Sequence, residues 1–528
     1  SVVCGSNATN TADTSGGKQA KSVVMGLDSA NTGESNVTIG SGAKTIATHS
    51  LKTTTKTAAN GSRISKVSES LPLDTTETSS SSTDADGVTT TIEIVKNSQP
   101  SAAIAIGQEA KSGGGYGIAL GYQSVADRAW DISIGRHAGA GQTTTQSEGR
   151  NIAIGDGALQ NAVNPNNNIA MGTSAGRNTT GAGNVIIGTY ANSPTANGAA
   201  ITASNVVAVG ERAVASSGSA VAVGSRSKSS GAITVAVGAS ANASGNYAIA
   251  QGYAAQATGT SSVAIGSAQN VPNQTRATAH YGTAIGFAAN AGAEGAIAIG
   301  RHANHDISSS AADSTGRAKT TGANSIAIGT DTNAAGQSSN AIGNTATATG
   351  KDSASFGSKA TATHESALAV GSAAQATNTN AVAVGGGAVA SAVGASALGR
   401  GANATGTNAV SVGIDSLANT DNAVAIGVNS KAQNNSNIAV GNLATATGAT
   451  SAIAVGRQSV ASGTSSIATG YKSAASTENS IAIGNTAAAN GGAGAIAVGK
   501  GTTATGTSAV VMGTDSQGTA QSVVVIGN

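Results

Sequence analysis

The sequence predicts an all-β fold, a parallel β-solenoid or β-roll built from coils of about 14 residues. The first observation is a recurring phrase of large aliphatic residue, Ala, large aliphatic residue and Gly, as in Ile104–Gly107 and Val221–Gly224. The second is its spacing, because from Gly329 to Gly441 the phrase-ending glycines recur every 14 residues without interruption. The third is composition: 73 of 528 residues are Gly and 2% are aromatic, far fewer aromatics than an ordinary globular core uses. Such a chain is a stack of equivalent units.

Each unit is expected to hold two short strands. The first half, as in residues 324–329, alternates branched residues with small ones at the period of a β-strand. The second half, as in residues 346–350, alternates Ala with Thr and ends in Gly. Gly reaches positive φ without steric cost, so tight turns fit between the strands. Frequent Gly, Thr, Ser, Asn and Val, with no helical period, disfavour helices.

The sizes of the side chains suggest how each coil packs. Facing sheets lie about 10 Å apart, so we expect the Val and Ile of the phrase to fill the interior. The central Ala then lies on the outer face, and a strand that is apolar on both faces favours burial on both. We therefore expect the alanine column to pack against the same column of other chains about a cyclic axis. The expected interface residues are Ala105, Ala222, Ala298, Ala327, Ala425 and Ala482.

The phrase resembles the head repeat of trimeric autotransporter adhesins, the YadA-like heads of bacterial surface fibres. That repeat is close to Asn-Ser-Val-Ala-Ile-Gly, which stands here as Asn324–Gly329 and Asn479–Gly484. The resemblance covers roughly residues 101–528 and the first 40. It implies a left-handed parallel β-roll, a homotrimer and display on the bacterial cell surface. It also implies binding to a host matrix protein, collagen among them, or to a host receptor.

The family's neck, stalk and membrane anchor do not occur in this segment, and both ends fall within a repeat. We expect the signal peptide and the anchor to lie outside this sequence, or the ends to associate with one another. No apolar run approaches the length of a membrane-spanning helix, and the net charge of +2 gives no reason to expect a nucleic-acid partner.

Interruptions of the period divide the chain into three segments. Residues 1–40 form N-terminal coils, and residues 41–100 form a protruding Ser/Thr-rich insertion. Within this insertion we expect a β-hairpin that sets residues 89–95 against residues 64–71, with a flexible loop as the alternative. Residues 101–528 form the main β-roll. Its loop insertions are expected near 136–151, 156–168, 189–205, 267–282 and 301–324.

Long side chains often follow the phrase glycine, where they would line one corner of the coil. Tyr and Arg favour protein interfaces, although solvated turns are the alternative. Together with the best copies of the phrase and one His-containing loop, these positions give the expected partner-binding residues. They are Asn324, Ser325, Ile326, Ala327, Ile328, Gly329, Asn479, Ser480, Tyr122, Tyr253, Arg301, His302, His305, Arg457 and Tyr471.

The sequence does not indicate an enzyme. It has one Cys and six His, lacks a phosphate-binding loop, and does not repeat the calcium nonapeptide of other solenoids. His302, His305 and Asp306 are spaced too commonly to predict a metal site, so we expect no catalytic residue, metal or cofactor.

The leading interpretation is an adhesin head that attaches at many points along its length. The alternatives are a structural fibre subunit or a phage tail-fibre segment. Ice or crystal binding is a minor alternative, because Thr-x-Thr motifs such as Thr347–Thr349 are not aligned on every coil.

Overall fold

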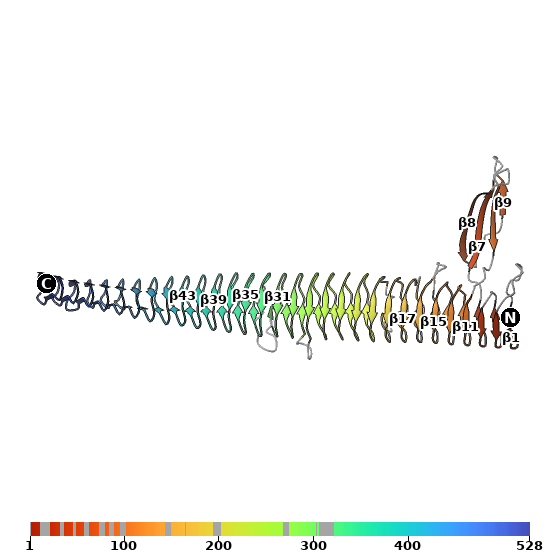
Figure 1. Ribbon diagram of the computed structural model, residues 1–528, viewed down its shortest axis with the longest axis horizontal. Helices are drawn as coiled ribbons and strands as arrows, with labels where there is room; N and C mark the ends of the chain where they lie inside the picture. Colours follow the sequence, from red (N-terminus) through yellow and green to blue (C-terminus); the bar gives the residue numbers. More distant parts are fainter. Residues whose placement is uncertain are drawn as a thin grey trace. The chain divides into compact units, whose positions relative to one another are not determined.

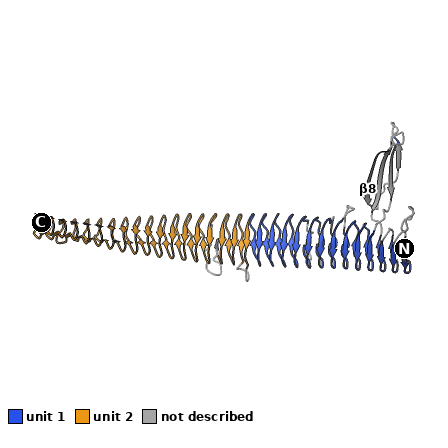
Figure 2. Ribbon diagram, viewed as in Figure 1, with its two compact units in different colours: residues 1–261 blue, residues 262–528 orange. Residues whose placement is uncertain are grey.

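The computed structural model divides into two units, residues 1–261 and 262–528 (Figure 2). Each unit is a stack of β-coils, which confirms the predicted parallel β-solenoid with coils of about 14 residues. The structure describes residues 2–10, 22–31, 36–45, 49–57, 63–72, 80–83, 89–95, 102–113, 115–142, 149–163, 165–193, 202–267, 274–302, 304–305 and 322–527.

Most coils contain one strand of three residues and one of two, and each strand pairs in parallel with its equivalent in the next coil (Figure 1). The three-residue strand is the aliphatic–Ala–aliphatic part of the phrase. In unit 2, for example, Val424, Ala425 and Ile426 pair with Ile438, Ala439 and Val440. A register offset of one full repeat places like residues above one another, so each column along the stack keeps one chemical character.

In unit 1 the three-residue strands are β1 (Val2–Cys4), β3 (Val23–Met25), β5 (Val37–Ile39), β11 (Ile104–Ile106), β13 (Ile118–Leu120), β15 (Ile132–Ile134), β16 (Ile152–Ile154), β17 (Ile169–Met171), β18 (Val185–Ile187), β19 (Val207–Val209), β21 (Val221–Val223), β23 (Val235–Val237) and β25 (Ile249–Gln251). The two-residue strands are β2 (Thr9–Asn10), β4 (Ala30–Asn31), β6 (Lys44–Thr45), β12 (Lys111–Ser112), β14 (Val125–Ala126), β20 (Val214–Ala215), β22 (Lys228–Ser229), β24 (Asn242–Ala243) and β26 (Gln256–Ala257).

In unit 2 the three-residue strands are β27 (Val263–Ile265), β29 (Thr283–Ile285), β31 (Ile297–Ile299), β33 (Ile326–Ile328), β35 (Asn340–Ile342), β37 (Ala354–Phe356), β39 (Leu368–Val370), β41 (Val382–Val384), β43 (Ser396–Leu398), β45 (Val410–Val412), β47 (Val424–Ile426), β49 (Ile438–Val440), β51 (Ile453–Val455), β53 (Ile467–Thr469), β55 (Ile481–Ile483), β57 (Ile496–Val498), β59 (Val510–Met512) and β61 (Val524–Ile526). The two-residue strands are β28 (Arg276–Ala277), β30 (Asn290–Ala291), β32 (Asn304–His305), β34 (Asn333–Ala334), β36 (Thr347–Ala348), β38 (Thr361–Ala362), β40 (Gln375–Ala376), β42 (Val389–Ala390), β44 (Asn403–Ala404), β46 (Leu417–Ala418), β48 (Lys431–Ala432), β50 (Thr445–Ala446), β52 (Val460–Ala461), β54 (Ala474–Ala475), β56 (Ala488–Ala489), β58 (Thr503–Ala504) and β60 (Gln517–Gly518).

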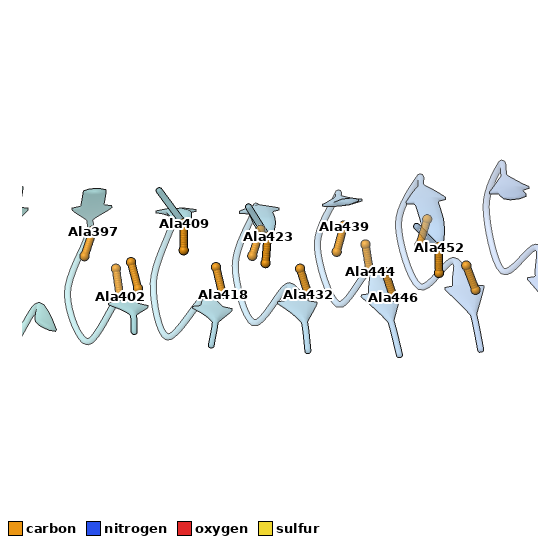
Figure 3. Close-up of a cluster of buried hydrophobic side chains, with 14 of the residues drawn as sticks. Ala397, Ala402, Ala409, Ala418, Ala423, Ala432, Ala439, Ala444, Ala446 and Ala452 are labelled. Atoms are coloured by element: carbon orange, nitrogen blue, oxygen red, sulfur yellow. The ribbon is translucent and has the colours of Figure 1, made fainter. Parts of the chain in front are cut away.

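The interior of the coils is lined by small side chains, chiefly Ala and Ser. Figure 3 shows such a column in unit 2, where Ala397, Ala409, Ala423 and Ala439 of one side face Ala402, Ala418 and Ala432 of the other. A coil of 14 residues closes through tight turns, so its two strands lie close together and leave no room for Val or Ile between them.

The predicted orientation of the phrase is therefore wrong. The phrase Ala points into its own coil, and the flanking aliphatic residues point outward, as the period-two alternation of a strand requires. The 10 Å spacing assumed from the sequence belongs to sheets that interleave large side chains. All six alanines expected at an interface are fully buried within a single chain, namely Ala105, Ala222, Ala298, Ala327, Ala425 and Ala482.

The glycine that ends each phrase is required by close stacking of the backbone. Gly427 has a φ of +131°, and a Cβ added there would lie 2.5 Å from the carbonyl oxygen of Gly441 in the next coil. Neighbouring coils repeat this contact, as between Gly413 and Gly427. A Cβ cannot approach an oxygen that closely, so the spacing of the glycines reports the stacking of the coils.

A group of coils in unit 1, from Gly135 to Gly210, has a different second half. Between β14 and β20 the described residues contain no two-residue strand, and successive turns stack instead, with the amide of Leu159 donating to the carbonyl of Ala175 (2.9 Å). Two large side chains, Leu159 and Ile186, are fully buried among the alanines of these coils. The longer intervals of the sequence thus correspond here to coils with larger interior side chains.

The insertion begins later than predicted, because Lys44 and Thr45 of β6 pair with Lys111 and Ser112 of β12 as part of a coil. Beyond them, the segment forms a four-stranded antiparallel sheet in the order β8-β7-β10-β9. Its strands are β7 (His49–Thr57), β8 (Arg63–Pro72), β9 (Ser80–Thr83) and β10 (Thr89–Val95). The predicted pairing of residues 89–95 with 64–71 is wrong, because β7 lies between β8 and β10. Parts of the other predicted insertions, residues 143–148, 194–201, 268–273 and 306–321, lie outside the described residues.

Candidate interaction surfaces

The outer side of the three-residue strands forms an apolar surface, which we call the aliphatic face. It consists of the two residues that flank the phrase Ala in each coil, such as Val424 and Ile426 in β47. In unit 2 the residue before the phrase glycine is often more than a third exposed, between 36% and 41% for Ile342, Phe356, Leu398, Ile426, Ile483 and Met512. Ordered aliphatic columns of this kind, left half exposed in one chain, are typical of a protein interface.

The outer side of the two-residue strands has the opposite character. In unit 2 most coils place a polar residue there, interrupted by Val389, Leu417, Val460, Ala474 and Ala488. The polar positions include Asn333, Thr347, Thr361, Gln375, Asn403, Lys431, Thr445, Thr503 and Gln517. Each coil of unit 2 therefore has an apolar outer side and a mainly polar one.

The residues one and two positions after the phrase glycine form a row along the first turn of the coils, which we call the first-turn row. Their side chains contact equivalents in the next coil. In unit 1, Nε2 of His137 lies 2.7 Å from Oε1 of Gln123, and the His137 ring meets the Tyr122 ring edge-on at 5.5 Å. Arg136 donates to Asp156 at 2.6 Å, and this hydrogen bond raises the pKa of Arg136. Tyr253 is 51% exposed in the same row.

The first-turn row continues within unit 2 with cations and aromatic rings. The guanidinium of Arg457 lies 4.5 Å from the ring centre of Tyr471 one coil on. Arg301 and His302 both approach Asp331, at 3.8 Å and 3.1 Å. The predicted residues Tyr122, Tyr253, Arg301, His302, Arg457 and Tyr471 therefore all belong to this row. These side chains are partly or fully exposed, so the row is available to a partner.

The consensus copies of the phrase contribute only part of what was expected of them. Asn324 and Asn479 occupy the left-handed region at φ +57° and +55°, which explains Asn at the turn before the strand. Ser325 and Ser480 are fully buried, and their hydroxyls donate to the carbonyls of Ala334 (3.1 Å) and Thr477 (2.7 Å).

Three of the expected partner-binding residues, Ser325, Ala327 and Ser480, are thus inside the coil and cannot contact a partner. Ile326 and Ile328 lie on the aliphatic face, and Gly329 shapes the turn with a φ of +132°. The regular alternation of the phrase fixes both results.

An aromatic stack on the second turn of unit 1 was not predicted as a site. Tyr116 and Trp130 occupy equivalent left-handed turn positions in successive coils, with ring centres 6.3 Å apart and planes 10° apart. The guanidinium of Arg150 lies 5.2 Å from the centre of the Trp130 ring. Trp130 stood out in the sequence as the only Trp, but only the coil register reveals its neighbours.

A buried polar ladder, also not predicted, runs through the coils with the longer intervals. The residue directly before the phrase is Asp131, Asn151, Asn168 or Asn184 in successive coils, where most other coils have Ser or Ala. The side-chain oxygen of each accepts from the backbone amide at the same position of the next coil, at 2.8–3.0 Å. The amide groups of Asn151, Asn168 and Asn184 donate to backbone carbonyls of the extra residues. The ladder joins coils of unequal length.

An ion pair occupies the first position of this ladder. Nε of Arg128 lies 3.3 Å from Oδ2 of Asp131, and both side chains are almost fully buried. Arg128 also donates to the carbonyl of Pro165 and to the side chain of Gln142 (2.9 Å). Burial raises the pKa of Asp131 despite the nearby guanidinium, and it lowers the pKa of Arg128. The pair is part of the core and is not exposed to a ligand.

His305 belongs to β32, but its side chain and Asp306 lie outside the described residues. Among the described residues, no group of three His, Cys, Asp or Glu side chains could hold a metal ion. In the part of the chain that the structure describes, no helix could span a membrane.

Comparison with protein families identifies the repeat. The family described as the YadA head domain repeat (2 copies) matches segments that together cover more than half of the chain. They are residues 102–124, 207–227, 229–250, 243–268, 277–303, 317–332, 321–346, 348–374, 376–402, 404–430, 449–473, 461–487 and 491–516. No curated protein matches the chain significantly.

The matches lie in the coils that keep the aliphatic–Ala–aliphatic–Gly phrase and omit most of the coils that contain the buried polar ladder. YadA heads are trimeric, non-enzymatic adhesins exposed at the bacterial outer membrane. The chain belongs to the YadA head domain repeat family.

Proposed function

We propose that three copies of this chain pack through their aliphatic faces and form an adhesin head that attaches to a protein ligand of a host. The observation that carries this proposal is the two-sided coil of unit 2. Ile426 is 39% exposed on one side, whereas exposed Lys431 of the same coil lies on the other. Burial of an aliphatic column against copies of itself removes apolar area from water at every coil, at roughly 25 cal/mol per Å².

The surfaces left outside the trimer are the polar sides and the turns. The first-turn row there presents Tyr, Arg and His side chains in several coils, such as Tyr122, Arg457 and Tyr471. Tyr and Arg contribute disproportionately to protein interfaces. Because the coil repeats, an extended ligand can contact successive rows, and many weak contacts together bind tightly. Collagen is an extended protein of this kind.

The experiment compares binding of the assembled and dissociated protein to surfaces coated with collagen or with laminin. The dissociated form carries Leu398→Glu, Ile426→Glu and Ile483→Glu, which place charges on the aliphatic face. A matched control carries Glu at Thr347, Thr361 and Thr445 on the polar side. We expect the unsubstituted protein and the control to bind a coated surface, and the dissociated form to bind on the order of 100-fold more weakly.

The insertion is tested in the same assay. Residues 46–100 are replaced by a short Gly-Ser linker, which retains the pairing of β6 with β12 and of β5 with β11. We expect this variant to keep its oligomeric state and to bind collagen as before, with any loss confined to a ligand that recognises the insertion. An unsubstituted protein that binds no coated surface and instead grows into long filaments would contradict the adhesin proposal and favour a structural fibre.

A further inference from the structure

A repeating apolar face does not by itself determine how far along the stack a second copy lies. Between Gly329 and Gly441 every coil has 14 residues, and each strand pairs with the next at an offset of one coil. A copy displaced by one coil would meet almost the same columns of Val, Ile and Leu. Hydrophobic contact is not directional, so the relative height of the copies must be set where the columns change.

The largest change on the aliphatic face of unit 2 occurs in two successive strands, β35 and β37. Asn340 stands where β33 has Ile326, and Ala354 follows in the same column. In the second column Phe356 takes the place of an aliphatic residue and is 36% exposed. Leu368 and Val370 of β39 then restore the aliphatic pattern. Two coils thus present an amide, a gap and an aromatic ring.

Asn340 is half buried, and within the described residues of one chain its side-chain amide makes no hydrogen bond. In an aliphatic interface such an amide is costly unless another polar group meets it. Phe356 and Ala354 are two residues apart in β37, so they lie side by side on one face. A large and a small residue at one height complement each other across an interface between copies.

We propose that Asn340, Ala354 and Phe356 form a register key that holds three copies of this chain at the same height. This inference rests on the proposed function, in which the aliphatic faces meet. At equal height the three Asn340 amides lie close enough to hydrogen-bond to one another, and Phe356 of each copy covers Ala354 of the next. A displacement of one coil sets Asn340 against Ile326 or Ala354, which leaves its amide unpaired.

Symmetry gives the key its consequence for assembly. A ring of three copies closes only when each neighbour is related by rotation alone. A displacement of one coil per neighbour produces a staircase that does not close and continues to add chains. Polar residues at single positions of coiled coils fix the register of an otherwise apolar interface in a comparable way.

The experiment measures register by disulfide formation. The natural Cys4 is replaced by Ser, and two variants then carry one cysteine each on the aliphatic face, Ile426→Cys and Val440→Cys. These residues are register partners in successive coils of one chain. The two variants are co-refolded and oxidised, and cross-linked peptides are quantified by mass spectrometry. Copies at equal height give 426–426 and 440–440 links, whereas copies displaced by one coil give 426–440 links.

We expect 426–440 links to be less than about a tenth of the 426–426 links when the key is intact, since a tenfold preference needs only about 1.4 kcal/mol. Asn340→Val, Ala354→Val and Phe356→Val together remove the key and should raise the mixed links to a comparable level. The control, Asn333→Val in the two-residue strand β34, should leave the ratio unchanged. Retention of the low ratio without the key would overturn the register key.

The same experiment separates the failure of the two proposals. Protein that stays monomeric in light scattering, or a trimer that forms none of these links, contradicts packing through the aliphatic face and hence the proposed function. A trimer that forms 426–440 links as readily as 426–426 links in the native sequence keeps the aliphatic interface and overturns the key alone.

Discussion

Ala425 and Ile426 are adjacent in β47, yet Ala425 is fully buried inside its own coil and Ile426 is 39% exposed on the aliphatic face. The pair shows how one short phrase serves two purposes. The alanine allows the two strands of a coil to approach each other, and the isoleucine supplies a surface that another copy can cover. The two residues therefore respond differently to substitution.

Ala425→Val should destabilise the fold, and Ile426→Glu should weaken assembly. Valine at position 425 overpacks an interior of small side chains, and overpacking typically costs about 1–3 kcal/mol. Glutamate at position 426 is tolerated by an isolated chain but buries a charge between copies. Thermal unfolding reports the first effect, and light scattering at decreasing concentration reports the second. If Ala425→Val leaves the unfolding temperature unchanged while weakening assembly, the orientation of the phrase is wrong.

Gly427→Ala should be more damaging than Gly387→Asn, although both glycines lie at a turn. At Gly427 the new Cβ would lie 2.5 Å from the carbonyl oxygen of Gly441, at a φ of +131°. Strain in such a backbone region alone costs roughly 1–3 kcal/mol. Gly387 has a φ of +67° with nothing near its Cβ position, and Asn429 already occupies the equivalent position two coils before Gly441's successor. Hydrogen exchange of the neighbouring strands measures the difference, and equal effects would contradict the close stacking of the phrase glycines.

Asn168→Ala should destabilise the coils that contain the buried polar ladder. The substitution removes the acceptor of the Asn184 amide and the donor to the Gly181 carbonyl. Each buried backbone group left without a partner costs about 1–3 kcal/mol. Thr173→Ala, at an exposed position of the next turn, is the matched control. Hydrogen exchange of β17 and β18 should quicken in the first variant only. Unchanged exchange in both would show that the ladder does not stabilise these coils.

The Arg128–Asp131 pair should make these coils less stable at neutral pH than in mild acid. Burial raises the pKa of Asp131 in the folded chain above its ordinary value of 3.8. The folded state therefore holds this proton at a pH where the unfolded chain has released it, and stability falls as the pH rises from 3.8 through the raised pKa. Hydrogen exchange of β15 and β16, corrected for the intrinsic effect of pH, measures this dependence.

Asp131→Asn has no carboxyl group to titrate, so the local pH dependence should disappear in this variant even though Arg128 loses its counter-ion. Asp156→Asn, which alters an exposed ion pair with Arg136, should retain the dependence. A native protein whose β15 and β16 become more stable between mild acid and neutral pH would show that the pKa of Asp131 is shifted in the other direction.

The repeat was predictable from the sequence because Gly, Ala and branched residues recur at a spacing that only stacked coils explain. Gly427 and its equivalents gave the coil boundaries, and the period-two pattern gave the strands. The direction of the phrase was not predictable from pattern alone. Alternation separates Ala425 from Ile426, but either face could be the interior until the closeness of the two strands of a coil is known.

The candidate surfaces were predictable only in part. The exposed turn residues Tyr471 and Arg457 follow directly from their place after the phrase glycine, and both belong to the first-turn row. The stack of Tyr116 on Trp130 depends on the coil register around a longer interval, which the sequence leaves open. The ladder had a signal that went unused. Asn151 and Asn168 stand before the phrase, where Ser or Ala is usual, and the coil that follows each is longer than 14 residues.

The most direct test of packing through the aliphatic face is the molar mass of the protein in solution, measured by light scattering for the native sequence and for the Leu398→Glu, Ile426→Glu and Ile483→Glu variant. One chain has a mass of 49.9 kDa. We predict three times this mass for the native protein and the mass of one chain for the variant. A native protein at the mass of one chain, or a variant that remains trimeric, would contradict packing of the copies through the aliphatic face.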